Sequence, residues 1–214
     1  QIGFFILIFL LGSIPFGLLI SRYWLKIDIR QQGSGNIGMT NVMRVGGKLP
    51  GIMTFVMDFG KGSLAVLLAQ TVFPVNVTSP EAQLLHLSLA GVVVVCGHVF
   101  SVFLRFKGGK GISTLFGVLA VLHFNIGLSA ALVWGGMFFW KKISSLSAIT
   151  MLIALPWFFI LLFIIVTNRH LINVIGKCVT KYLNVFQKCY IHSTTIIFYS
   201  VTEYFITFMT TFIH

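Results

Sequence analysis

Residues 82–104 read AQLLHLSLAGVVVVCGHVFSVFL and contain no formally charged side chain. A run of about 20 apolar residues is the length of helix that crosses the hydrocarbon core of a bilayer. The whole chain shares this character, since 57% of its 214 residues are hydrophobic and 9% are charged, with a mean hydropathy of +0.98. A soluble domain of this size would leave roughly 30% of its unfolded surface in water. We therefore expect an integral membrane protein and exclude a water-soluble fold.

Uncharged segments recur on both sides of this stretch. They cover residues 1–21, 49–80 with interruptions only at Asp58 and Lys61, 112–140 and 143–168. The last two are long for one helix and short for two. Because the Gly-Gly pair at 135–136, His123 to Asn125 and Pro156 offer places for a turn, we expect a hairpin of short helices in each. The sequence thus predicts an all-α fold in which some membrane helices are short.

The positive side chains predict the topology. Lys and Arg cluster at 22–48, 105–110, 141–142 and 169–188, whereas 71–83 has neither and holds Glu81. Short cytoplasmic loops collect Lys and Arg. Placing all four clusters in the cytoplasm requires an N-terminus outside and about seven transmembrane helices.

Acidic residues are too few to build a metal site. The chain has 15 Lys and Arg but only four acids, Asp28, Asp58, Glu81 and Glu203, for a net charge of +11. Carboxylate-built metal sites and paired-carboxylate chemistry are therefore nearly excluded. The three cysteines, Cys96, Cys178 and Cys189, lack zinc-type spacing. We expect no metal, no cofactor and no nucleic-acid partner.

The segment GSGNIGMTNVMR, Gly33 to Arg44, has the composition of an anion site. Its glycines allow tight turns that bring backbone N–H groups near a ligand, and its Arg offers a planar fork suited to phosphate oxygens. The glycines are Gly33, Gly35 and Gly38, and the neutral donors are Ser34, Asn36, Thr40 and Asn41. A polar connecting loop with a helix cap explains the same spacing.

A second basic, glycine-rich segment follows within GHVFSVFLRFKGGKGIST, Gly97 to Thr114. Lys107 and Lys110 stand among Gly108, Gly109 and Gly111 at the start of an expected helix. Cationic side chains and a helix N-terminus together favour a phosphoryl group. The spacing is not that of a Walker A loop. The alternative is a positive-inside anchor without a ligand.

Three further ionisable residues fall inside apolar runs. Asp58 and Lys61 lie three residues apart, so they share one helix face and can neutralise one another. His98 is expected at the same level of the membrane. Intramembrane charges are expensive and suggest function, but structural pairing and a packing histidine are equally good explanations. We assign all three a supporting role.

These motifs, taken in order, resemble the PlsY family of membrane glycerol-3-phosphate acyltransferases, which use acyl phosphate as donor. The resemblance rests on LGSIPFG at 11–17, GSGNIGMTN, DFGKG at 58–62, GHVFSVF, FKGGKGIST, SSLSAI at 144–149, and His170 with Asn173. It covers about residues 1–173. It implies a single transmembrane acyltransferase domain over 1–177, followed by a hydrophobic tail, 178–214, of unassigned role.

The resemblance also implies a reaction and a set of site residues. The product would be 1-acylglycerol 3-phosphate, or lysophosphatidic acid, made by a multi-pass enzyme of a bacterial plasma membrane whose active site faces the cytoplasm. Its partners would be acyl phosphate, glycerol 3-phosphate and the bilayer. Carried over by residue, Ser34, Arg44, Lys110 and Ser145 would surround phosphate groups as the catalytic set, and His170 and Asn173 would lie near glycerol 3-phosphate. Ten further residues of the two glycine-rich segments are expected to bind substrate: Gly33, Gly35, Asn36, Gly38, Thr40, Asn41, Lys107, Gly108, Gly109 and Gly111.

The residues themselves leave one other class of protein open. A small multi-spanning transporter of a phosphorylated anion also uses Gly, Pro and basic residues at its site. Its site would lie near the membrane midplane, whereas the basic residues here gather toward one face. We therefore prefer the enzyme and keep the transporter as the alternative.

The shortage of acids generates a first prediction. Acyl transfer by the purified protein should proceed at the same rate in excess EDTA as in untreated buffer, because too few hard oxygen ligands exist for a divalent cation. Activity that is lost in chelator and restored by Mg²⁺ would contradict it.

Overall fold

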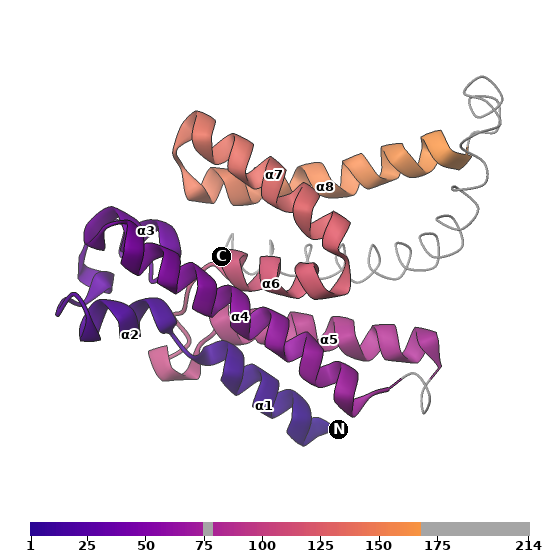
Figure 1. Ribbon diagram of the computed structural model, residues 1–214, viewed down its shortest axis with the longest axis horizontal. Helices are drawn as coiled ribbons and strands as arrows, with labels where there is room; N and C mark the ends of the chain where they lie inside the picture. Colours follow the sequence, from indigo (N-terminus) through magenta and orange to yellow (C-terminus); the bar gives the residue numbers. More distant parts are fainter. Residues whose placement is uncertain (75–78, 168–214) are drawn as a thin grey trace. The chain divides into compact units, whose positions relative to one another are not determined.

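The computed structural model describes residues 1–74 and 79–167, and these residues are helical without any strand (Figure 1). The all-α prediction is confirmed. The helices are α1 (Ile2–Ser13), α2 (Phe16–Tyr23), η1 (Ile29–Gln31), α3 (Met39–Gly46), α4 (Lys48–Val72), α5 (Pro80–Val99), η2 (Val102–Leu104), α6 (Ile112–Leu122), α7 (Phe124–Lys141) and α8 (Ser144–Thr167). The chain divides into two compact units, Gln1–Ala148 and Ile149–His214. The expected domain boundary at residue 177 lies outside the described residues.

Three helical stretches among the described residues are long and apolar enough to cross a membrane. They are Ile2–Tyr23, Lys48–Val72 and Pro80–Leu104. The 11-residue α6 is shorter than a full crossing, as expected for the first half of a hairpin, and the chain turns at His123 before α7. Lys61 and Asp58 are the only charged side chains inside the second stretch apart from its first residue. A count of seven crossings stays a prediction.

The expected turn at Pro156 is wrong. α8 runs without interruption from Ser144 to Thr167, with Pro156 inside it. Proline removes one backbone hydrogen bond, but the flanking residues are apolar, and in hydrocarbon their backbone groups have no water to bond. Continuing the helix therefore costs less than opening it. Among the described residues this segment therefore forms one helix, Ser144–Thr167, and not the expected hairpin.

The first crossing is broken between α1 and α2 at Ile14 and Pro15. Ile14 has an extended backbone, as the residue before a proline prefers. The break leaves carbonyl groups without partners in the helix, and two side chains distant in the sequence donate hydrogen bonds to them. Ser101 Oγ donates to the Ser13 carbonyl, and Lys61 Nζ donates to the Ile14 carbonyl at 2.9 Å. The break is therefore a built feature that ties α1 to α4 and to the segment after α5.

Glycines let two helix pairs approach to backbone contact. In the α4 and α6 pair, a Cβ on Gly62 would overlap the Thr114 carbonyl oxygen, and one on Gly117 would overlap the Phe59 carbonyl oxygen. In the α1 and α5 pair, Gly12 meets the backbone of Val94 in the same way. In lipid there is no hydrophobic driving force between helices, and small residues at such crossings permit the close van der Waals packing that holds the helices together. Figure 1 shows α4 running between α6 on one side and α1 on the other.

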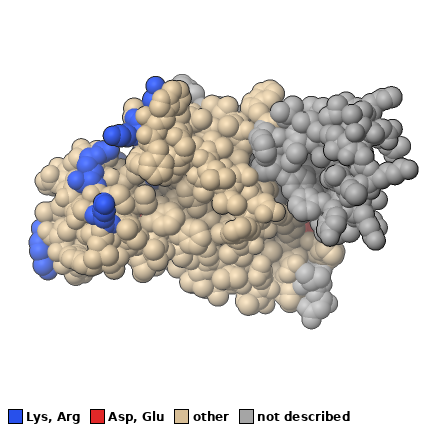
Figure 2. Space-filling model, turned by 45° about the horizontal axis from the view of Figure 1, so that its top comes forward, with Lys and Arg blue, Asp and Glu red and all other residues tan. Residues whose placement is uncertain are grey.

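Positive side chains gather at one end of the described molecule. On the face drawn in Figure 2, the Lys and Arg side chains lie at the left, where α2 and α3 lie in Figure 1. Lys61, in the middle of α4, is instead buried, and its side chain is 1% exposed. This one-sided distribution is the pattern that the positive-inside rule describes.

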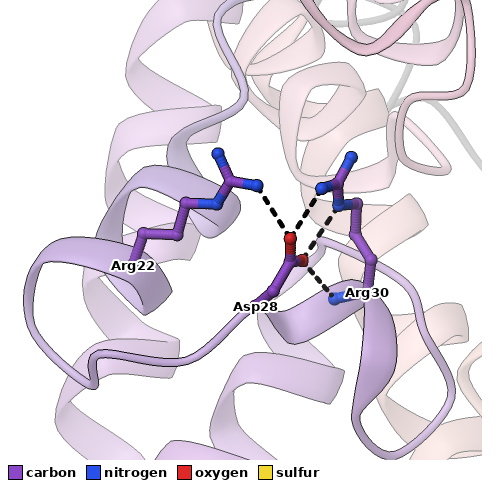
Figure 3. A network of polar contacts seen from close by, with 3 residues as sticks. All are labelled: Arg22, Asp28 and Arg30. Atoms are coloured by element: carbon purple, nitrogen blue, oxygen red, sulfur yellow. Dashed lines mark hydrogen bonds and ion pairs between the residues drawn. The ribbon is translucent and has the colours of Figure 1, made fainter.

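A carboxylate orders the loop at this end (Figure 3). Asp28 accepts hydrogen bonds from Arg22 at 2.8 Å, from the Arg30 side chain at 2.6 and 2.9 Å, and from the Arg30 backbone N–H at 3.1 Å, which caps η1. The Arg30 and Arg22 guanidinium groups hold the pKa of the Asp28 carboxyl well below its usual range. Both ion pairs of Asp28 lie at the surface, so they contribute little to global stability. They fix the path of the chain into the first glycine-rich segment.

The α4 and α6 crossing generates the second prediction. Gly62→Ala should lower the midpoint of thermal unfolding in detergent, because its Cβ must push the α6 backbone away at a cost of about 1–3 kcal/mol. Gly60→Ala is the matched control in the same helix, since no atom lies within 4 Å of its Cβ position. That control should be neutral or slightly stabilising. Equal midpoints for the two variants would contradict the close crossing.

Candidate active site

The first unit contains a cleft that is open to the surface. Its walls come from six parts of the chain. The segment before and within α3 contributes Asn36, Gly38, Met39 and Thr40; α4 and α5 contribute Phe55, Asp58 and His98; the second glycine-rich segment and α6 contribute Lys110, Gly111, Ile112, Ser113 and Phe116; α7 contributes Trp134 and the start of α8 Ser144. Both glycine-rich segments of the sequence therefore meet at one cavity.

Two helix N-termini face this cleft without side-chain caps. α3 begins after Gly38 and α6 begins after Gly111, and neither N-cap residue supplies a side-chain hydrogen bond. The first amides of a helix have no partner within it, and they carry the positive end of the helix dipole. Gly111 adopts a φ of 75°, a backbone conformation suited to glycine, and this turns the chain into α6. The two termini therefore present backbone N–H groups at the same cleft.

Asn41 organises the first glycine-rich segment from inside. Its side chain is buried, and its Nδ2 lies within hydrogen-bond distance of the Ile29, Gln32 and Asn36 carbonyls at 3.4, 3.0 and 2.9 Å, while its Oδ1 accepts from the Ser34 backbone N–H at 2.9 Å. These bonds use both amide hydrogens. Asn41 therefore positions the loop and does not offer the free donor expected from the sequence. Asn36 Oδ1 accepts from the Gly38 N–H at 2.8 Å and so fixes the entry to α3.

The amides of Gly108 and Gly109 are also committed within the protein. Gly108 donates to the Val99 carbonyl at 2.9 Å, and Gly109 donates to the His98 carbonyl at 3.1 Å. These carbonyls end α5 and have no partner inside that helix. The glycine pair thus caps α5, and the amides left for a ligand are those that follow it, in the first turn of α6. The expectation that Gly108 and Gly109 bind substrate stays a prediction.

Lys110 is the cationic side chain that lines the cleft. Its Nζ donates a hydrogen bond to Ser145 Oγ, which brings the second glycine-rich segment together with the start of α8. Partial burial lowers the pKa of the Lys110 ammonium, and the positive charge of Arg44 lowers it further. Arg44, near the end of α3, contributes this charge from an exposed side chain.

The supporting residues form one buried cluster, and two of them, Asp58 and His98, also line the cleft. Lys61 Nζ lies 2.9 Å from Asp58 Oδ1, and His98 Nδ1 lies 3.5 Å from the same oxygen. His98 Nδ1 also lies 3.3 Å from Thr114 Oγ1 in the first turn of α6. The charges of Asp58 and Lys61 are fully enclosed, as intramembrane charges must be when they pair with each other. The sequence correctly indicated the pairing of Asp58 with Lys61.

The predicted residues thus fall into three groups. The structure brings Asn36, Gly38, Thr40, Lys110 and Gly111 into the cleft wall and Ser145 against Lys110. Ser34, Arg44 and Lys107 are exposed and do not line the cleft. Five further residues shape the two loops, namely Gly33, Gly35, Asn41, Gly108 and Gly109. His170 and Asn173 lie outside the described residues. Sequence reasoning missed Ser113, Phe55 and Trp134, since their contribution depends on how α4, α6 and α7 cross.

Comparisons with known proteins identify the family. The family model for glycerol-3-phosphate acyltransferase matches residues 2–186. A protein of that name from Dinoroseobacter shibae is 43% identical over 150 residues, which are 70% of each chain. One from Caulobacter vibrioides is 46% identical over 142 residues, 66% of this chain and 62% of the relative, and one from Pelagibacter ubique is 36% identical over 177 residues, 78% and 87% respectively.

Solved structures agree. The crystal structure of PlsY, an integral membrane glycerol 3-phosphate acyltransferase, in its glycerol 3-phosphate form has a TM-score of 0.64 at 39% identity, over 75% of this chain and 76% of that one. Its lysophosphatidic acid form has a TM-score of 0.62 at 38% identity over the same shares. The chain therefore belongs to the glycerol-3-phosphate acyltransferase family of the PlsY type, and it is a multi-pass integral membrane enzyme that acylates glycerol 3-phosphate to lysophosphatidic acid.

Proposed function

We propose that the acyl donor is an acyl phosphate, and that the acyl group passes directly to the 1-hydroxyl of glycerol 3-phosphate in the cleft, with inorganic phosphate as second product. The observation that carries this proposal is the meeting of two uncapped helix N-termini with Lys110 at one cavity. Such a site suits phosphate groups, and both substrates of this reaction carry one.

The charge of the site matches two phosphorylated ligands. Lys110 lines the cleft and Arg44 lies near enough to lower the pKa of its ammonium. Bringing two cations together costs free energy in the empty site, and bound phosphate oxygens relieve it. Ser34 and Ser145 are proposed as additional donors to these oxygens, and His170 and Asn173 as residues near the glycerol.

The reaction needs positioning more than it needs an acid or a base. The glycerol hydroxyl oxygen attacks the acyl carbonyl carbon, a new C–O bond forms, and the bond from that carbon to the phosphate oxygen breaks. The departing phosphate takes the electron pair and can also take the hydroxyl proton, so atoms and charge balance without a protein base. Holding both substrates in line is worth roughly 7–11 kcal/mol of barrier, and Lys110, Arg44 and the amides of α6 stabilise the developing oxyanion.

The chain is poorly equipped for a thioester donor. Acyltransferases that use thioesters resemble one another in a His-x4-Asp pair, whose carboxylate orients a proton-accepting histidine. The only aspartates are Asp28 and Asp58, and five positions before them stand Tyr23 and Met53. Asp28 is taken up by Arg22 and Arg30. A donor that is already activated and carries its own phosphate fits these residues better.

The cytoplasmic face is proposed as the side of the active site. The cleft opens among the residues of the basic end, and short cytoplasmic loops collect Lys and Arg. An N-terminus outside a bacterial plasma membrane is consistent with this choice. The same reasoning weighs against an anion transporter, whose site would lie at the midplane.

The contact of Lys110 with Ser145 raises one mechanistic alternative, an acyl-enzyme on Ser145. A lysine of lowered pKa beside a serine hydroxyl is the arrangement of Ser-Lys hydrolases. We favour direct transfer because Lys110 is needed as a cation for phosphate and Ser145 is exposed at the start of a helix. The two mechanisms differ in whether phosphate is released before glycerol 3-phosphate arrives.

The third prediction concerns Lys110. Lys110→Ala should lower kcat/KM by about 10²–10³-fold, the loss typical for one preorganised donor to a developing charge. Lys48→Ala, an exposed lysine at the start of α4, is the matched control and should behave as the wild type. Near-normal turnover of Lys110→Ala, with intact insertion in the membrane, would refute the assignment.

Lys110 also predicts the alkaline limb of the pH profile. Its pKa is lowered, so the ammonium is present below that value and is lost as the pH rises through it, at a lower pH than for an ordinary lysine. Activity should fall over the same range. Lys110→Arg should retain part of the activity without this decline, since a guanidinium stays charged. A wild-type profile that is flat up to the ordinary lysine pKa would contradict the role.

The fourth prediction separates donors and mechanisms in one assay. Purified protein should form lysophosphatidic acid from palmitoyl phosphate but not from palmitoyl-CoA. Phosphate release should require glycerol 3-phosphate, with no stoichiometric burst in its absence. Comparable product from the CoA ester would overturn the donor, and a burst of one phosphate per enzyme that Ser145→Ala abolishes would replace direct transfer with an acyl-enzyme.

A further inference from the structure

His98 is a buried side chain in contact with the glycine pair that precedes Lys110. It is 4% exposed and lies in the last turn of α5, where its own carbonyl accepts the Gly109 N–H at 3.1 Å. A Cβ placed on Gly109 would overlap His98 Nε2, and its three nearest atoms would all belong to the imidazole ring. The ring therefore occupies the space that any side chain at position 109 would need.

The Nδ1 edge of the His98 ring faces Asp58 and Thr114. His98 Nδ1 lies 3.5 Å from Asp58 Oδ1 and 3.3 Å from Thr114 Oγ1. A carboxylate only accepts hydrogen bonds, so the contact with Asp58 needs a hydrogen on Nδ1. Asp58 is held in turn by Lys61, whose Nζ also donates to the Ile14 carbonyl at the break between α1 and α2. One network thus joins four helices to the loop.

We propose that His98 is a positioning residue of the acyltransferase site, which seats Gly109 against α5 and thereby sets where Lys110 and the first amides of α6 meet the phosphate of a substrate. The proposal deepens the function proposed above and rests on it. His98 lines the cleft beside Lys110, and Thr114, its second neighbour, belongs to the first turn of α6. Both sides of the anion site are therefore in reach of one imidazole.

A histidine suits this role better than an apolar side chain would. Its flat ring fits under a residue without a Cβ, and its Nδ1 has a fixed partner, so the ring cannot rotate freely. The burial of Asp58 and Lys61 is costly, and their pairing is retained where a unique arrangement is needed. Here the arrangement that they fix is that of the ring beneath the loop.

The test is a double-mutant cycle between positions 98 and 109. Gly109→Ala alone should lower kcat/KM at least tenfold, chiefly by raising the apparent KM for a phosphorylated substrate, because its Cβ displaces the loop from the ring. His98→Ala alone should also raise KM. If the two changes acted independently, the loss in kcat/KM of the double variant would be the product of the two single losses. We expect the double variant His98→Ala with Gly109→Ala to be at least tenfold more active than that product, since removing the ring makes room for the new methyl group.

Gly108 provides the matched control. A Cβ on Gly108 would meet the backbone carbonyl oxygens of His98 and Val99, which no truncation of a side chain removes. Gly108→Ala should therefore be equally damaging with or without His98→Ala. His98→Asn should be milder than His98→Ala, since its amide keeps a donor toward Asp58, and His98→Asn with Gly109→Ala should be the most active of the double variants.

The same cycle is read out by binding of inorganic phosphate to the detergent-purified protein by titration calorimetry, together with its thermal midpoint. Coupling between positions 98 and 109 in the dissociation constant of phosphate supports the proposal, provided that the thermal midpoints of the variants agree within a few degrees. This holds even if the wild type does not use acyl phosphate. In that case only the donor assignment fails. Multiplicative losses, or rescue of Gly108→Ala as strong as that of Gly109→Ala, would overturn it.

Discussion

The backbone contact of α4 with α6 is the constraint on which the site depends. Gly62 and Gly117 let the two helices touch without side chains between them, and Thr114 on α6 consequently lies against α4. This contact brings the N-terminus of α6 to the level of Asp58 and fixes it beside α5. Without it, the two uncapped helix termini would not share one cleft. A bilayer supplies no hydrophobic driving force between helices. A short helix such as α6 is therefore held by close packing through small residues.

The two glycine-rich segments divide their polar groups between holding the fold and facing the ligand. In the first, Asn41 bonds the loop backbone from inside, and in the second, Gly108 and Gly109 cap the end of α5. Their polar groups are satisfied within the protein, as buried groups in a low-dielectric setting must be. The groups that we propose for the substrates are the first amides of α3 and α6 and the cations Lys110 and Arg44. The loops are rigid frames for a small number of donors, which is the condition for electrostatic preorganisation.

Apolar runs and positive clusters were sufficient to predict a helical membrane protein, the break at His123 and the pairing of Asp58 with Lys61. Hydropathy did not predict that α8 continues through Pro156, because a proline is a breaker in water and is tolerated where backbone groups have no other partner. Motif composition indicated an anion site but not which amides serve it, since that depends on the capping of α5 by a loop nine or ten residues further along the chain. Ser113, Phe55 and Trp134 carry no motif, and only the crossing of their helices brings them to the cleft.

The most direct measurement of this account is the position of bound phosphate in a structure of the protein determined with glycerol 3-phosphate and a non-hydrolysable acyl phosphonate. The account predicts phosphate or phosphonate oxygens about 3 Å from Lys110 Nζ and from backbone N–H groups in the first turn of α6, within the cleft that Asn36 and Ser144 also line. Ligands bound with both phosphorus atoms outside that cleft, and with Lys110 free of them, would contradict it.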